Sequence, residues 1–270
     1  MKKVLLVVLM ICAIIFTGCG SESNEILVGT IKYLNLTEDE LDALINQDNS
    51  SPKKRKHIFF DNMTSLMAAL ESRRIEEISI YRTVAIYLNS RHPELHWEIS
   101  EPVVTDIFCC AFREEDTALK KDFDNAILQL TKNGTLSKFV KRYLDEVSRG
   151  EEPPIVQLPT FYGERTIKVG VTGDLPLLDY IRPDGQPAGF NTALLAEISK
   201  ILEANIVLVQ VDSGARSAAL SSKHVDVIFW SVMPQKDTAV PKNFDKPDGM
   251  ILTEPYFSDD IVHVRLRKDE

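Results

Sequence analysis

A loop rich in glycine and proline leads from an apolar run into an amphipathic helix within residues 167–202. The apolar run, 167–171, predicts a buried strand. The residues that fix turns or permit positive φ in the connection are Pro176, Pro183, Gly185, Pro187 and Gly189. The connection is therefore a shaped surface. In open α/β sheets such strand–loop–helix connections, with backbone N–H groups turned outward, are places where small ligands bind.

The first half of the chain alternates between strand and helix patterns. Strands are expected at 26–30, 57–60 and 77–80, and helices near 38–46 and 83–89. Thr37 is the expected N-cap of the first helix, and Glu40, three residues on, completes a capping box. This alternation predicts an α/β fold with a parallel sheet covered by helices. With 270 residues, 44% of them hydrophobic, the chain is long enough for two lobes.

Three motifs in the second half resemble one bacterial family. Asp184, Gly185, Gly189, Phe190 and Asn191 have the spacing of a D-G-x-x-x-G-F-[DN] turn into a helix. Residues 213–230 and the run TEPYF at 253–257 follow in the same order. Together they resemble the type 3 extracellular solute-binding proteins of bacterial ABC importers. The resemblance implies a two-lobed fold of the periplasmic-binding-protein type II, in which each lobe is a mostly parallel sheet flanked by helices.

The order of the segments differs from that of the family. Residues 63–88 resemble the family's second lobe and 107–144 its closing strand and helices, yet both precede the first-lobe motifs. We therefore expect a circular permutant with a second-lobe-like segment plus closing helices at 25–148, a linker at 149–165 and a first-lobe-like segment at 166–270. A rival interpretation has two half-modules in tandem, each pairing with another chain.

The amino terminus has the pattern of an export signal. Lys2 and Lys3 precede an apolar run at 4–16, about 13 residues long, where a spanning helix needs roughly 20. The run ends Phe-Thr-Gly-Cys, which resembles a lipobox. We expect residues 1–18 to be a lipoprotein signal peptide, Cys19 to carry the lipid, and 19–24 to form a tether. The alternative is an ordinary secretory signal.

The charge argues against nucleic acid as a partner. The formal net charge is -9, and loss of residues 1–18 removes two lysines and no acid, which gives -11. Nucleic-acid-binding proteins present a basic stripe instead. The one basic cluster in the sequence, 53–56, is expected in a solvated loop spanning 47–56, with contact to anionic lipid as the alternative.

Two adjacent cysteines, Cys109 and Cys110, remain in the expected mature chain besides Cys19. Neighbours on a strand point to opposite faces, so a disulfide between them would be strained. We expect two buried free thiols. Asp259 and Asp260 are expected in a solvated turn.

The resemblance implies a ligand clamp between the lobes, made of an arginine, a carboxylate and an aromatic ring. This chain departs from that clamp at three positions. The arginine expected soon after Trp230 is absent, Tyr81 stands where the family has the second-lobe aspartate, and Leu178 stands where it has the aromatic residue. Arg216, Lys236 and Arg82 are candidates for an anionic ligand group. The full set of expected ligand-binding residues is Asp174, Leu178, Tyr180, Arg216, Trp230, Ser231, Tyr81 and Arg82.

The sequence thus predicts a substrate-binding lipoprotein of an ABC importer. It would bind a small polar solute, dock on an ABC transporter permease, and be held on the extracytoplasmic face of the cell membrane by Cys19. Hinges are expected near 106–112 and 261–266. The alternative is a sensory or interaction lipoprotein without transport. An enzyme such as a small dehydratase is not expected, nor is a cofactor. A metal site is not expected either, because Pro93 disrupts the helix that would pair His92 with His96.

Overall fold

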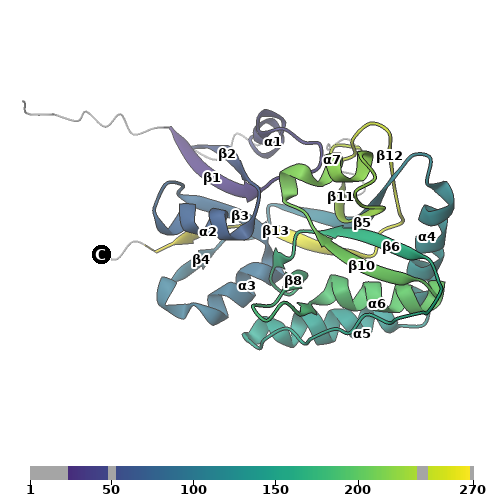
Figure 1. The fold of residues 1–270 in the computed structure, drawn as a ribbon. Coiled ribbons are helices and arrows are strands. Elements are labelled where there is room, and N and C mark those ends of the chain that lie inside the picture. Colours follow the sequence, from purple (N-terminus) through teal and green to yellow (C-terminus); the bar gives the residue numbers. More distant parts are fainter. Residues whose placement is uncertain (1–23, 48–52, 236–242, 268–270) are drawn as a thin grey trace, which may run out of the picture.

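Ten strands form one curled sheet in the computed structural model (Figure 1). The structure describes residues 24–47, 53–235 and 243–267. The strand order is β10-β6-β11-β5-β13-β3-β1-β2, with β12 beside β5 and β4 beside β13. Strands β10, β6 and β11 are parallel to each other, as are β3, β1 and β2, whereas β5 and β13 are antiparallel to their neighbours.

The sheet consists of two sets of strands, which we call lobe one and lobe two. Lobe one contains β6 (Thr166–Val171), β10 (Asn205–Gln210), β11 (Val227–Pro234), β12 (Met250–Leu252) and β5 (Val104–Arg113). Lobe two contains β1 (Glu25–Ile31), β2 (Lys54–Phe60), β3 (Glu77–Tyr81), β4 (Trp97–Ile99) and β13 (Phe257–Leu266). The expected two-lobed α/β fold, with a mostly parallel sheet in each lobe, is confirmed.

The lobes join where β5 and β13 pair antiparallel, with Phe108 opposite Phe257 and Val104 opposite Ile261. Each half of the chain lends one strand to the other's lobe: β5 completes lobe one and β13 completes lobe two. The crossing covers 104–108 and 257–261. The expected hinge segments, 106–112 and 261–266, overlap this crossing only in part, at 106–108 and at 261.

Helices cover both faces of the sheet (Figure 1). In lobe one, α6 (Phe190–Leu202) packs against α4 (Thr117–Lys132) and α5 (Thr135–Phe139), with α7 (Arg216–Ser221) on the opposite side. In lobe two the helices are α1 (Glu38–Ile45), α2 (Met63–Glu71) and α3 (Arg82–Arg91). The short elements are β7 (Asp174–Leu175), β8 (Asp179–Ile181), β9 (Pro187–Ala188), η1 (Pro93–Leu95), η2 (Val140–Asp145), η3 (Val147–Arg149) and η4 (Ser213–Ala215). One hydrophobic core runs through both lobes.

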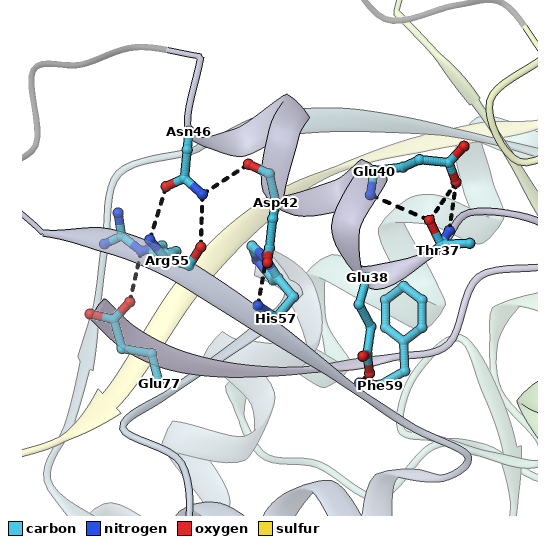
Figure 2. A network of polar contacts seen from close by, with 9 residues as sticks. All are labelled: Thr37, Glu38, Glu40, Asp42, Asn46, Arg55, His57, Phe59 and Glu77. Atoms are coloured by element: carbon cyan, nitrogen blue, oxygen red, sulfur yellow. Dashed lines mark hydrogen bonds and ion pairs between the residues drawn. The ribbon is translucent and has the colours of Figure 1, made fainter. Parts of the chain in front are cut away.

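Helix α1 begins at the expected capping box (Figure 2). The Thr37 hydroxyl accepts from the Glu40 backbone N–H at 3.3 Å, and the Glu40 carboxylate accepts from the Thr37 N–H at 2.9 Å. At the other end of α1, the Asn46 side chain bonds the backbone of Arg55 twice. Its amide nitrogen donates to the Arg55 carbonyl, and its amide oxygen accepts from the Arg55 N–H. The helix is thus tied at both ends, and its far end is attached to β2.

The basic tract 53–56 was expected wholly in a loop, and this is wrong for Lys54, Arg55 and Lys56. These three residues open β2 and pair in parallel with residues 25–27 of β1. The Arg55 guanidinium also lies 2.9 Å from the Glu77 carboxylate on β3 (Figure 2). Pairing with a strand distant in sequence overrides the local signal of a charged run.

The expectation for the cysteine pair on β5 is confirmed, whereas the one for the aspartate pair on β13 is wrong. Cys109 and Cys110 are free and buried, as expected. Asp259 and Asp260 lie within β13, so the expected solvated turn is wrong. Asp259 is only 8% exposed, and it accepts hydrogen bonds from the hydroxyl and the backbone N–H of Thr83 at the start of α3.

Candidate functional site

The glycine-rich connection of lobe one is folded back on its own helix. The carbonyls of Leu177 and Leu178 accept from the backbone N–H groups of Phe190 and Asn191, the first residues of α6, at 2.7 and 2.8 Å. Gly189 has φ 95°, and a Cβ there would lie 2.8 Å from the Leu177 oxygen. The outward N–H groups expected at this helix start are therefore used within the loop, which corrects the sequence-based interpretation.

Three of the expected site residues belong to this connection. Leu178 is 1% exposed and lies in the hydrophobic core. Tyr180 is partly exposed, and burial together with the nearby Glu152 raises its pKa. Asp174 contacts lobe two, because its carboxylate accepts from the backbone N–H of Met63 at the start of α2.

Arg216 is the largest fully buried side chain of the described residues, at 1% exposure. Its Nε and Nη1 donate to the carbonyls of Ser213 and Trp230, at 3.1 and 2.5 Å, and its Nη2 donates to the carbonyl of Lys32 in lobe two at 2.6 Å. The guanidinium carbon lies 4.3 Å from the centre of the Trp230 ring. Arg216 thus links the two lobes through backbone carbonyls and a cation–π contact.

A chain of hydrogen bonds continues from Trp230 into lobe two. The Trp230 indole donates to the Tyr81 hydroxyl at 3.0 Å, and the Tyr81 and Tyr33 hydroxyls each donate to Asp106 Oδ2 at 3.3 Å. Trp230 belongs to β11 and Tyr81 to β3, while Asp106 lies on the crossing strand β5. The chain of bonds therefore spans the junction of the lobes.

A second buried carboxylate, Asp245, lies at the same junction. It accepts from the backbone N–H of Asn35 in lobe two at 3.0 Å and from that of Val232 in lobe one at 3.4 Å. Burial raises the pKa of Asp245 to about 6 despite the opposing effect of Arg216. Burial, with Asp245 nearby, raises the pKa of Asp106 to about 7.

We call this group of side chains the interlobe site: Tyr33, Tyr81, Asp106, Arg216, Trp230 and Asp245. A cavity of about 20 Å³ lies beside it, lined by Tyr33, Tyr81, Trp230, Leu175 and several apolar residues of lobe two. A volume of this size holds about one water molecule. In this structure the lobes are closed on each other, and their own side chains fill the interface.

The structure brings together some of the expected site residues and separates others. Arg216, Trp230 and Tyr81 meet in the interlobe site. Ser231 is 1% exposed, and its hydroxyl has no hydrogen-bond partner among the described residues. Arg82 is exposed at the start of α3, and Lys236 lies outside the described residues. The expected ligand contacts of these residues stay predictions.

Sequence reasoning missed Tyr33, Asp106 and Asp245. Asp106 carried a usable signal, because it is an acid at the start of the run IFCCAF, which reads as a buried strand. A carboxylate at the head of a buried strand is costly unless it has a role or a partner. Tyr33 and Asp245 lie in loops, where nothing in the local sequence indicates burial.

The second half of the chain matches a family model. The model describes the bacterial extracellular solute-binding proteins, family 3, and it matches residues 167–265. Residues 167–265 belong to this family. The matched solute-binding segment contains Trp230, Arg216 and the whole glycine-rich connection. No curated protein matches the chain.

The chain is also similar, at low identity, to several solved structures. The periplasmic domain of BvgS from B. pertussis is 12% identical, with 91% of this chain and 38% of that one covered and a TM-score of 0.42. A mutant of arginine-bound ArgBP from T. maritima is 12% identical over 91% and 89% of the chains, with a TM-score of 0.39. The ligand-binding component of an ABC-type import system from Staphylococcus aureus, with zinc bound, is 14% identical over 90% and 66%, with a TM-score of 0.42. Similarity at this level identifies no ligand for this chain.

None of the helices among the described residues has the length and apolar character needed to cross a membrane. The expected signal peptide and Cys19 lie outside the described residues.

Proposed function

We propose that this chain is the substrate-binding lipoprotein of an ABC importer, a binding protein rather than an enzyme, and that it takes a small polar solute between its lobes. The observation that carries the proposal is the interlobe site, where polar groups of both lobes meet within a family-3 scaffold. Buried polar groups that converge from two bodies are the usual form of a small-molecule site.

Binding would work through lobe closure. A solute that contacts groups of both lobes binds the closed form more tightly than the open form, and so shifts the population toward closure. The crossing strands β5 and β13 are the connection about which such a motion turns. A permease would then recognise the closed form.

A ligand screen tests the solute-binding part. Thermal unfolding is followed with single amino acids, amines, short peptides and sugars at millimolar concentration. A true ligand at about 100 times its Kd adds roughly 2.7 kcal/mol to the free energy of unfolding. If no compound in any class raises the unfolding temperature, the proposal fails.

Lipidation at Cys19 is tested in cells. The wild-type chain should partition with the membrane fraction and incorporate a fatty-acid label, and Cys19→Ser should lose both. Cys12→Ser is the matched control, because Cys12 lies in the expected signal peptide and would leave with it. A labelled Cys19→Ser protein would contradict the lipid anchor.

A sensory or interaction lipoprotein is the second candidate. It is favoured by the contact between the lobes. There, Arg216, Asp245 and Asp174 form hydrogen bonds with backbone groups of the chain itself, so no ligand is needed to complete them. Small-angle X-ray scattering distinguishes the two functions. A transport protein should be open without ligand and compact with it, whereas a protein with a fixed closed form should give one radius of gyration throughout.

A further inference from the structure

We infer that Asp106 is the cation-binding group of the interlobe site, and that the solute is a small ammonium compound without a carboxylate. This inference rests on the proposed solute-binding function and specifies the chemical class of its ligand.

Asp106 is a buried acid without a compensating cation. It is 3% exposed, and no Lys, Arg or His of the described residues forms an ion pair with it. Its partners are the neutral hydroxyls of Tyr33 and Tyr81, both at 3.3 Å, which is long for a hydrogen bond between oxygen atoms. An ionised carboxylate in such a place needs either a proton or a cation.

The surroundings of Asp106 add to its attraction for a cation. Asp245 and Asp259 are also buried, and the negative charge of each raises the pKa of Asp106. The rings of Tyr33, Tyr81 and Trp230 line the cavity, and the hydroxyls of Tyr33 and Tyr81 connect it to the carboxylate. Aromatic faces attract an ammonium group through the ring quadrupole, and the attraction increases when water is excluded. An ammonium head group is about the size of the water molecule that the cavity can hold.

The buried arginine of the site is already in use. Arg216 directs its Nε, Nη1 and Nη2 at three backbone carbonyls, and its planar face lies over Trp230. A ligand carboxylate would have to displace these contacts to form a bidentate pair with Arg216. Among the described residues, the site therefore offers free negative charge and no free positive charge, which favours a cation over a zwitterion.

Proton balance gives a measurable consequence. Burial raises the pKa of Asp106 to about 7, so near neutral pH part of the population holds a proton there. An ammonium ligand would bind the ionised carboxylate, and the proton held by Asp106 would then be released to the solvent. Its affinity should rise by about tenfold between pH 6 and pH 8, which is the change in the ionised fraction of a group that titrates near 7.

The experiment is isothermal titration calorimetry of the intact mature chain. The probes are methylammonium, n-butylammonium and putrescine, with glycine and glutamate as carboxylate-bearing comparisons, at pH 6 and pH 8 and in two buffers of different ionisation enthalpy. At least one ammonium probe should bind, with tighter binding at pH 8 and proton release at pH 7. Asp106→Asn should weaken binding at least tenfold at pH 8.

Asp179→Asn is the matched control. Asp179 is another buried aspartate, 2% exposed, but it holds the backbone N–H of Thr172 within lobe one. Its substitution should lower stability and leave ammonium affinity unchanged. If Asp106→Asn fails to fold, proton release by the wild-type chain and the Tyr33→Phe, Tyr81→Phe double variant, with an expected weakening of a few-fold, still test the inference.

Two outcomes would overturn it. Binding of glycine or glutamate in preference to every ammonium probe would leave the proposed function standing and remove Asp106 as its cation site. The inference also fails if an ammonium probe binds Asp106→Asn as tightly as wild type. Failure of all probes, cationic and zwitterionic alike, would count against both the inference and the proposed function.

Discussion

At the scale of single residues, the junction of the lobes depends on a few buried polar groups with backbone partners. Arg216 satisfies three carbonyls from η4, β11 and the segment after β1. Burial lowers its pKa to about 10, which leaves it charged at neutral pH. A buried charge that depends on hydrogen bonds to the backbone is stable only while each partner stays in place.

Replacing Arg216 by alanine should cost about 3 kcal/mol of unfolding free energy, because it leaves three carbonyls without a donor and opens a large cavity. Arg82→Ala is the control. Arg82 is exposed on α3, so its removal should change stability by about 0.5 kcal/mol or less. Urea unfolding of both variants provides the comparison, and equal losses would contradict the bridging role of Arg216.

A second residue-scale prediction concerns acid stability. His263 is 4% exposed with no partner for Nε2, and burial lowers its pKa to about 3. Its ordinary pKa near 6.5 applies in the unfolded chain, so the unfolded chain binds more protons between pH 6.5 and pH 3, and folding stability falls as the pH drops through that window. His263→Gln should therefore lose about 2 kcal/mol less than wild type between pH 7 and pH 4.5.

Urea unfolding at the two pH values measures this difference. His92→Gln serves as the control for a histidine substitution outside the core, because the His92 side chain is exposed. The buried carboxylate of Asp106 acts with the opposite sign: its raised pKa means that stability falls as the pH rises from about 4 to about 7. Asp106 is present in wild type and in both His variants, so its effect cancels in the comparison.

At the scale of elements, the connection between β6 and α6 depends on the backbone geometry of Gly189. Gly189 and Gly185 both have positive φ, at 95° and 80°. A Cβ at Gly189 would meet the carbonyl oxygens of Leu177 and Leu178 at 2.8 and 2.9 Å, whereas a Cβ at Gly185 would meet nothing within 4 Å. Those two carbonyls hold the first N–H groups of α6.

Gly185→Ala should therefore lower the free energy of unfolding by about 1 kcal/mol, which is the cost of a left-handed conformation alone. Gly189→Ala should cost about 3 kcal/mol or more, because the clash is with backbone atoms that cannot move without releasing α6. Chemical denaturation of the pair separates conformational strain from steric clash. Equal costs would show that the close approach at Gly189 is relaxed easily.

At the scale of the whole molecule, the two halves of the chain depend on each other. Strand β5 comes from the first half and lies between β11 and β13 of the second half. Each half alone would leave a lobe without its antiparallel strand and expose unpaired backbone groups. This arrangement suits the circular permutation, which stays a prediction.

Cutting the linker tests this dependence. A specific protease site placed after Tyr162, whose side chain is 96% exposed, should be cleaved without separating the halves. A denaturing gel should show two fragments, while gel filtration should give one peak at the mass of the uncut chain. Fragments that separate, or an uncut chain of twice the expected mass, would favour the tandem half-modules that pair with other chains.

Local signals accounted for most elements of the fold. The capping box of Thr37 and Glu40 and the apolar run before the glycine-rich loop both predicted their elements, because each depends on near neighbours in the sequence. The start of β2 in the basic tract and the burial of Asp259 were missed. Both depend on strands that pair across many residues, and pairing of that kind leaves no local trace.

The sequence by itself determined the α/β class, the two-lobed family likeness and the choice of Arg216, Tyr81 and Trp230 as residues of one site. These depend on hydrophobic periodicity and on the order of motifs, which are properties of the sequence. The tertiary structure decided what those side chains do. It turned Arg216 toward carbonyls, joined Tyr33 and Tyr81 to Asp106, and left that carboxylate without a cation among the described residues. Hydrogen-bond partners and desolvation are set by atoms from distant parts of the chain, which meet only in the folded protein.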